Sequence, residues 1–312
     1  MRRLLLLVLF AAAPMVGAQA APFAYVPNEG SGSLSVIDVA SDAVVAEIAV
    51  GEKPRGTAVS LDGRTAYVAE QPDVLALVDL VARRRTGQIA IGQSPEGVGI
   101  SRDGRWVIVA CEETNEIAFI DTRSNALSFS VPVQGKNPEH AEFSPDGRYV
   151  LASAEDGQAV DVIDVAARRE IAHIDVGVRP RGIAFANDSR RAYVAAETSN
   201  EVYVIDMSSW QVVAKIKVGL RSNGLVMSPD GKTLYVSNGG DGTVSALDVA
   251  SERVVATVPV GQRPWNMAIS PDGKKLYVAC GRSGAVSVID TQKNERIADI
   301  PVGKLPWGVA IR

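Results

Sequence analysis

A short motif that occurs seven times contains most of the residues of this chain that could bind a ligand or take part in catalysis. Each copy follows a glycine that usually comes after Val or Ile, and it contains a position that is usually proline. The residues before that position are Lys53, Ser94, Asn137, Arg179, Arg221, Arg263 and Leu305. The residues after it are Arg55, Glu96, Glu139, Arg181, Asn223, Trp265 and Trp307. Six of these fourteen residues are basic and two are tryptophans, so their chemistry depends on whether the chain brings them together.

Gathered at one place, these side chains predict a pocket for a planar, anionic molecule. Guanidinium groups fork onto carboxylates, and indoles stack on flat ring systems. The predicted anion contacts are Arg55, Arg181, Arg221 and Arg263, and the predicted stacking surface is Trp265 and Trp307. The alternative is an ordinary rim of surface ion pairs worth ~0–1 kcal/mol each, with Arg55 on Glu70 and Arg181 on Glu197.

Two of the seven copies are acidic instead. Glu96 groups with Glu112 and Glu113, and Glu139 groups with His140, Glu155 and Asp156. Gathered carboxylates attract a cation, and Ca²⁺ takes about six to eight oxygen ligands at defined distances. No EF-hand loop is present, so we expect no metal site. Glu96, Glu139 and His140 are the alternative ligands, and His140 is otherwise expected to be a packed polar residue.

Motifs for other chemistry are absent. The chain has no C-x-x-C-H haem attachment site and no G-x-S-x-G elbow, and its only histidines are His140 and His173. Alternation places His173 on a sheet face, away from the other candidates. We therefore expect no enzyme. The alternative is a lactonase-like hydrolase, whose site would contain Glu96, Glu139, His140, Arg55 and Arg181.

A 42-residue repeat must position these residues. The motif glycines Gly51, Gly92, Gly135, Gly177, Gly219, Gly261 and Gly303 are 41 to 43 residues apart. Each unit holds four short runs rich in Val, Ile, Ala and Tyr, and an Asp-Gly turn separates the first two, with Ser189 in place of glycine in one unit. A period of this length with four strands per unit is typical of a β-propeller blade.

The two chain ends complete the count of units. Residues 23–50 match the last three strands of a unit, and residues 304–312 match only the first. Joining them gives seven whole units and removes both exposed sheet edges. The sequence therefore predicts an all-β, seven-bladed β-propeller of four-stranded antiparallel blades, closed by the C-terminal strand joining the N-terminal three strands.

The ring also predicts whether the two cysteines can form a disulfide. Cys111 and Cys280 occupy equivalent positions of the third and seventh units, which lie nearly opposite each other in a seven-membered ring. A disulfide needs Cα atoms within about 7 Å. We therefore expect two free, half-buried thiols.

The N-terminal sequence and the composition indicate where in the cell the protein is expected to act. Residues 1–20 read as a secretory signal peptide, with Arg2 and Arg3 before an apolar run and a small-residue cleavage site ending at Ala20. Residues 21–312 are expected to form one domain, without a membrane span, in the periplasm and as a monomer. The net charge of −4 gives no electrostatic reason to bind nucleic acid.

The recurring text LYVSN (234–238), AYVAA (192–196) and LYVAC (276–280), each followed by VSVID-like residues, resembles the YVTN β-propeller repeat family. Seven such units behind a signal peptide look like the propellers associated with catabolism of alcohols dependent on pyrroloquinoline quinone (PQQ). That resemblance implies a periplasmic binding or accessory protein, PQQ as a ligand, and a PQQ-dependent dehydrogenase or ABC-transport components as partners. A docking scaffold for such a dehydrogenase or transporter is the second function considered.

Overall fold

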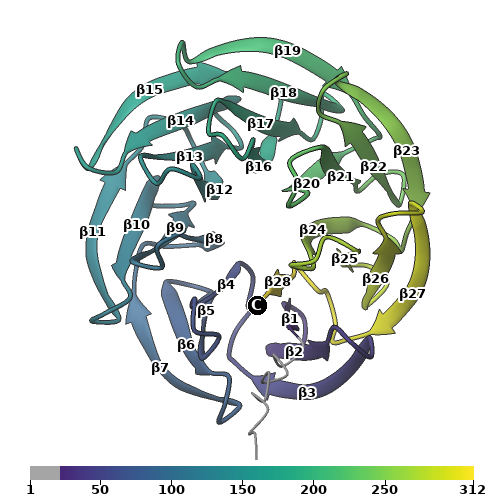
Figure 1. Cartoon of the computed structure of the whole chain (residues 1–312). Helices are drawn as coiled ribbons and strands as arrows, with labels where there is room; N and C mark the ends of the chain where they lie inside the picture. The colour runs from purple at the N-terminus through teal and green to yellow at the C-terminus, as the bar shows by residue number, and fades with distance from the viewer. Residues whose placement is uncertain (1–21) are drawn as a thin grey trace, which may run out of the picture.

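The structure of this chain, a computed structural model, describes residues 22–312. These residues form seven four-stranded antiparallel sheets arranged as blades around a central axis (Figure 1). The predicted seven-bladed β-propeller is therefore confirmed. The expected signal peptide at residues 1–20 lies outside the described residues, and within 22–312 no helix is long and apolar enough to cross a membrane.

The blades are numbered here from the N-terminus, each from its innermost to its outermost strand. Blade 1 contains β28 (Ala310–Ile311), β1 (Phe23–Asn28), β2 (Ser33–Asp38) and β3 (Ala43–Ala49). Blade 2 contains β4 (Thr57–Val59), β5 (Thr65–Glu70), β6 (Val74–Asp79) and β7 (Arg84–Ala90). Blade 3 contains β8 (Pro95–Ile100), β9 (Trp106–Cys111), β10 (Glu116–Asp121) and β11 (Ala126–Pro132). Blade 4 contains β12 (Pro138–Phe143), β13 (Tyr149–Ala154), β14 (Ala159–Asp164) and β15 (Arg169–Asp175).

The remaining three blades repeat this pattern. Blade 5 contains β16 (Pro180–Phe185), β17 (Arg191–Ala196), β18 (Glu201–Asp206) and β19 (Gln211–Lys217). Blade 6 contains β20 (Ser222–Met227), β21 (Thr233–Asn238), β22 (Thr243–Asp248) and β23 (Arg253–Pro259). Blade 7 contains β24 (Pro264–Ile269), β25 (Lys275–Cys280), β26 (Ala285–Asp290) and β27 (Glu295–Pro301).

The turn between the first two strands of each blade shows why the repeat folds locally as it does. In blade 2 the Asp62 carboxylate accepts hydrogen bonds from the Ser60 hydroxyl at 2.6 Å and from the Arg64 backbone N–H at 3.0 Å. The next residue, Gly63, has a φ of 71°, which glycine adopts without steric cost. Ser189 takes the same left-handed conformation at 60° in blade 5, as the sequence pattern predicted.

The loop that leads from one blade into the next, the inter-blade loop, uses a second left-handed position. The residue before the usual proline has a φ between 45° and 58° in all seven copies, although none of these residues is glycine. A left-handed non-glycine residue carries a modest steric cost. The recurrence of this conformation gives the seven loops the same course, so the residues that follow the proline position all come to the same end of the channel.

The core lies between the blades. Most core clusters combine apolar residues of two neighbouring blades, and the cluster that joins blades 7 and 1 contains Val26, Ile37, Tyr277 and Val288, all buried. Tyr67, Tyr193 and Tyr277 are among the largest fully buried side chains, in blades 2, 5 and 7. Each sheet therefore buries its two faces against its two neighbours.

The C-terminal segment closes the ring as predicted. Strand β28 pairs with β1 through Ala24↔Ile311 and Tyr25↔Ala310. Backbone hydrogen bonds extend the seam, with the Phe23 N–H donating to the Arg312 carbonyl at 2.9 Å and the Trp307 N–H donating to the Pro27 carbonyl at 3.0 Å. The first and last residues of the described chain are thus held in one blade.

The cysteines are free, as predicted, but the expectation of half-buried thiols was wrong. Cys111 ends β9 and Cys280 ends β25, and both side chains are fully buried. Burial raises the pKa of Cys111 to about 12 and also raises the pKa of Cys280. These thiols act as small core side chains rather than nucleophiles.

Deleting residues 304–312 should lower the melting temperature of the protein by about 10 °C or more, because it removes the inner strand of blade 1 and exposes apolar faces of blades 1 and 7. The measurement is thermal unfolding followed by circular dichroism. Arg312→Ala is the control, because it removes only the side-chain bonds to the Leu61 carbonyl at 2.8 and 3.0 Å. A truncated protein that melts with the parent would contradict closure of the ring by this segment.

Candidate functional site

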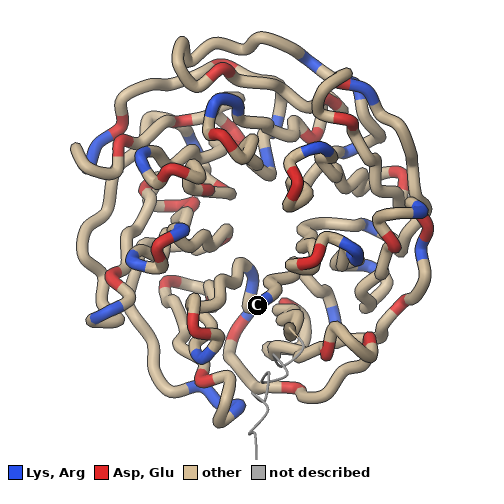
Figure 2. The backbone as a smooth tube through the Cα atoms, viewed as in Figure 1, with Lys and Arg blue, Asp and Glu red and all other residues tan. Residues whose placement is uncertain are grey.

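One end of the channel opens into a charged cavity of about 330 Å³, called the mouth here. Inter-blade loops and the ends of second strands supply its walls, and Figure 2 shows acidic and basic residues gathered on the loops around the central opening. The residues lining the mouth are Glu29, Arg55, Glu96, Glu112, Glu139, Glu155, Arg179, Arg181, Asn223, Arg263, Trp265, Asn266 and Trp307.

The ring brings together most of the site residues predicted from the sequence. Arg55, Arg181, Arg263, Trp265 and Trp307 line the mouth. Arg221 does not line it: this exposed residue lies at the outer edge, where its Nε contacts a Glu197 carboxylate oxygen at 2.9 Å. The mouth is therefore built from five of the six residues proposed as ligand contacts.

Glu197, at the start of the loop after β17, is the centre of the basic wall. Its carboxylate lies 2.8 Å from Arg181 Nε and 3.0 Å from Arg263 Nη2, in addition to the contact with Arg221. Arg179 Nε lies farther away, at 3.8 Å. Burial alone would raise the pKa of this 1% exposed carboxyl, but the guanidinium groups of Arg181 and Arg263 outweigh burial and lower it to about 2.

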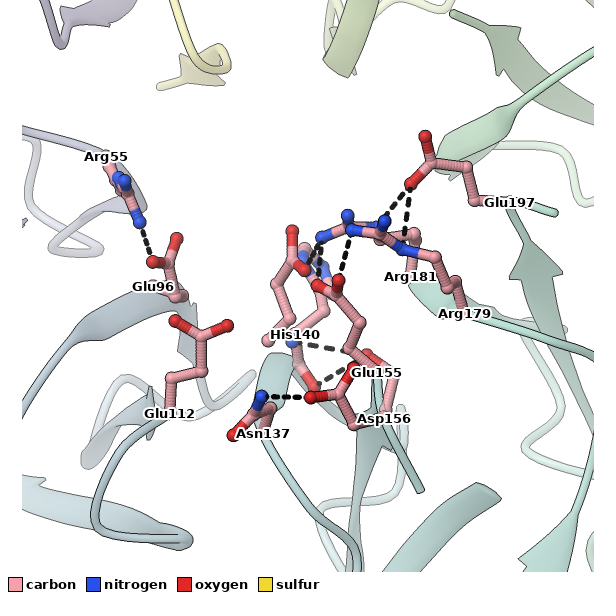
Figure 3. Close-up of polar contacts among 12 residues, drawn as sticks. Arg55, Glu96, Glu112, Asn137, His140, Glu155, Asp156, Arg179, Arg181 and Glu197 are labelled. Carbon is pink, nitrogen blue, oxygen red and sulfur yellow. Dashed lines mark hydrogen bonds and ion pairs between the residues drawn. The ribbon is translucent and has the colours of Figure 1, made fainter. Parts of the chain in front are cut away.

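Arg181 in turn contacts three carboxylates. Besides Glu197, it pairs with Glu155 at 2.7 Å (Figure 3). It also pairs with Glu139, which like Glu155 belongs to blade 4. Burial lowers the pKa of this guanidinium, and the charge of Glu197 opposes the shift. The predicted pair of Arg181 and Glu197 is confirmed, but as part of a buried network rather than a solvated surface pair.

The opposite wall is acidic. Arg55 pairs with Glu29 at 3.3 Å and with the nearly buried Glu96, so the predicted pair of Arg55 and Glu70 was wrong. Glu70 lies outside the mouth, where Arg85 contacts it at 3.2 Å, because its side chain turns toward the outer strand of its own blade. One guanidinium therefore faces several carboxylates on this wall, and the mouth is polarised, basic at blades 5–7 and acidic at blades 1–3.

The acidic groups considered as alternative metal ligands are not gathered as the sequence suggested. Carboxylate oxygens of Glu112, Glu139 and Glu155 lie within 4.8 Å of one another, whereas Glu96 pairs with Arg55. Asp156 accepts a hydrogen bond from Asn137 Nδ2 at 2.5 Å and turns away (Figure 3). Because Arg181 already contacts two members of this trio, its positive charge occupies the place that a cation would take.

A narrower chamber of about 190 Å³ continues the mouth into the channel. Its polar lining includes His140 and Glu142 from β12, Asn266 from β24 and Thr57 from β4. Burial lowers the pKa of His140 to about 4. Burial also raises the pKa of Glu142 to about 7, with the Phe143 backbone N–H opposing the shift. His140 faces the channel as predicted, but Glu142 was missed, although its place two residues along the same strand was a usable signal.

The two tryptophans of the mouth differ in how much ring surface they expose to a ligand. Trp265 is partly exposed, and the guanidinium carbon of Arg263 lies 5.8 Å from its ring centroid. Trp307 is only 9% exposed and is packed into the wall between blades 7 and 1. A planar ligand would therefore find its stacking surface chiefly on Trp265, with an edge of Trp307 beside it.

Fold and site define a seven-bladed β-propeller with a charged channel mouth. The family model of the cytochrome D1 haem domain matches residues 18–142 and 112–218, which together span more than half of the chain. The model of the seven-bladed β-propeller lactonases matches residues 166–298. These matches relate the chain to the cytochrome D1 haem-domain propellers and to the lactonase-type propellers.

Solved structures agree on the fold. The chain is similar to Kuenenia stuttgartiensis hydrazine synthase, with 25% identity, a TM-score of 0.80, and coverage of 91% of this chain and 99% of that one. A functionally unknown protein from Desulfotomaculum acetoxidans DSM 771 is 16% identical, with a TM-score of 0.82 over 93% and 98% of the two chains. The dihydro-heme d1 dehydrogenase NirN in complex with DHE is 18% identical, with a TM-score of 0.72 over 96% and 77%. No curated protein matches the chain.

Glu197→Gln should destabilise the protein by about 3 kcal/mol at pH 7, because it leaves the buried Arg181 and Arg263 without their shared counter-charge. The folded-state pKa is below the ordinary 4.5, so this stabilisation is present above pH 4.5 and is lost as the pH falls toward 2. Denaturant unfolding at pH 7 and pH 3 measures it, and the difference between parent and variant should shrink at pH 3. Glu252→Gln, on the exposed pair with Arg191, is the control and should cost less than about 1 kcal/mol.

Glu142→Gln should stabilise the protein at pH 8 by about 1–2 kcal/mol and have no effect at pH 4. The folded-state pKa of about 7 lies above the ordinary 4.5, so the cost of ionising this carboxyl is absent below pH 4.5, grows up to pH 7 and is complete above it. Melting temperatures across this pH range test the prediction. Glu295→Gln on the exposed outer strand β27 is the control, and equal melting of parent and Glu142→Gln at pH 8 would contradict the burial of this carboxyl.

Proposed function

We propose that this protein is a periplasmic binding or accessory propeller rather than an enzyme, and that its mouth binds a planar molecule whose carboxylates lie on one edge. The observation that carries this proposal is the polarised mouth, in which a tryptophan face and a guanidinium wall share one open cavity. Trp265 and Arg263 are adjacent in it, and Arg181 lies on the same wall. Export is supported by the signal-like sequence of residues 1–20.

The charges of the mouth select the orientation of such a ligand. Arg179, Arg181 and Arg263 of this wall, together with the exposed Arg221 just outside the mouth, share the three carboxylates Glu139, Glu155 and Glu197. The group as a whole carries one positive charge in excess. A ligand carboxylate can add to this wall or take the place of Glu155. On the opposite wall Glu29, Glu96 and Glu112 repel anions, so the rest of the ligand must be neutral or cationic.

Two ligand classes are supported by different observations. The resemblance to PQQ-associated propellers supports PQQ, a tricarboxylic quinone, and it also supports a PQQ-dependent dehydrogenase or ABC-transport components as partners. The family match to the cytochrome D1 haem domain supports a haem-type ligand, bound without covalent attachment. The acidic wall favours the haem type. The two propionates of haem lie on one edge of the macrocycle, whereas the three carboxylates of PQQ are divided between its two end rings.

Titration of the mature protein with haemin and, separately, with PQQ should show tight binding of haemin, with half-saturation at or below about 10 µM, and weaker binding of PQQ. Quenching of tryptophan fluorescence is the measurement. Trp265→Phe should remove most of the quenching, since this ring forms the stacking surface. Trp106→Phe and Trp210→Phe are matched controls away from the mouth and should leave the response to ligand unchanged.

Absence of quenching by both ligands at 50 µM would overturn the binding proposal. The match to the lactonase model favours hydrolysis as the second candidate function, with Glu139 and His140 as the residues to test. We expect the parent protein to hydrolyse a panel of lactones no faster than Glu139→Gln and His140→Ala. A rate that falls in these variants would establish the hydrolase instead.

A further inference from the structure

The outer part of blade 4 contains a cluster of ligating side chains that is separate from the mouth. Asp161 of β14 lies directly opposite His173 of β15 in the antiparallel ladder. His173 Nδ1 and Asp161 Oδ1 are 2.5 Å apart, and a carboxylate oxygen of Glu170 lies within 4.8 Å of both side chains. The register shift in β15 between these residues brings Glu170 next to His173.

The backbone fixes both carboxylates of this cluster. The Gly135 N–H donates to Asp161 Oδ2 at 3.0 Å, and the preceding Gln134 N–H donates to Glu170 Oε2 at 2.7 Å. One oxygen of each carboxylate thus accepts a hydrogen bond from a backbone N–H, and the other oxygen is available on the side of the imidazole ring. Such outer hydrogen bonds orient metal ligands in proteins.

Other blades show that this cluster exceeds what the fold requires. In blade 6 the Gly219 N–H donates to Asn238, and in blade 7 the Gly261 N–H donates to Ser287. Neutral side chains therefore satisfy the same backbone glycine. The fold alone calls for neither a carboxylate at Asp161 nor the further ionisable groups of His173 and Glu170.

The two carboxylates of this cluster also lack the arginine partners that carboxylates have at the corresponding place in other blades. Blades 2 and 7 place Arg85 and Arg296 at the position of Glu170, and these arginines contact Glu70 at 3.2 Å and Asp299 at 3.3 Å. In residues 22–312 no arginine or lysine forms an ion pair with Asp161 or Glu170.

We propose that Asp161, Glu170 and His173 bind one Zn²⁺ ion, with a water molecule as the fourth ligand. One imidazole nitrogen and two carboxylate oxygens form a ligand set that Zn²⁺ accepts in tetrahedral geometry at about 2.0–2.2 Å. Ligand atoms around such an ion are about 3.4 Å apart. The three side chains need to adjust only slightly, and the ion displaces the proton shared by His173 and Asp161.

The ion would connect β14 to the edge strand β15. Its two carboxylate ligands also accept hydrogen bonds from Gln134 and Gly135, in the inter-blade loop that leads to Glu139. His173 is 25% exposed and Asp161 is fully buried, so solvent can deliver an ion to one side of the cluster. The inference does not depend on what the mouth binds.

Isothermal titration of ZnCl₂ into chelator-treated, dialysed protein at pH 7.5 tests the inference. The expected result is one site per chain with a dissociation constant of 1 µM or tighter and release of protons, seen as a heat that changes with the ionisation enthalpy of the buffer. His173→Gln should weaken binding at least 30-fold. Glu170→Gln, which keeps an acceptor for the Gln134 N–H, should weaken it at least 10-fold.

Two control variants separate this cluster from other candidates. Glu112→Gln alters the acidic trio of the mouth, and His140→Gln removes the other histidine of the chain, and both should bind Zn²⁺ as the parent does. Melting temperatures without metal confirm that each variant is folded, and Glu170→Gln serves if His173→Gln is not. No binding at 100 µM Zn²⁺, unchanged binding in the folded variants, or loss of binding in Glu112→Gln would each overturn the assignment.

Discussion

Each blade of this propeller has two apolar faces, and only another blade can cover them. Cores such as the one between blades 7 and 1 therefore exist only because the ring is closed, and nine C-terminal residues complete the closure by adding β28 to β1. The same closure sets the distance of every inner strand from the axis. The mouth and the chamber below it are consequences of this packing, since their residues come from blades that are far apart in the sequence.

Bringing seven inter-blade loops to one opening concentrates charge, and the structure manages that charge by pairing. Glu197 receives three close guanidinium contacts, and Arg181 contacts three carboxylates, so neither ion is left uncompensated in a partly dry environment. The pairing is uneven around the ring. A polarised mouth results, and it discriminates between ligands by where they carry charge rather than by their net charge.

The repeat offers an internal comparison that a single sequence otherwise lacks. Positions that keep one residue type in most blades, such as the Asp-Gly turns, serve the fold. Positions at which one blade differs are candidates for function, and blade 4 differs at both ends of its sheet. Its inner strand carries His140 and Glu142 and its third strand carries Asp161, whereas the other blades have uncharged residues at these positions.

The sequence alone determined the number of blades, the turns, the closing strand and the free cysteines, because each follows from local spacing and alternation. It also predicted that Arg181 and Trp265 would meet at one opening, since equivalent positions of a ring share one end. The pairing partners required the tertiary structure: Arg55 forms ion pairs with Glu29 and Glu96 rather than with Glu70, and the side chain of Cys111 is completely buried. Side-chain direction and the distance between neighbouring blades decide such contacts, and neither is encoded in the spacing of residues along one strand.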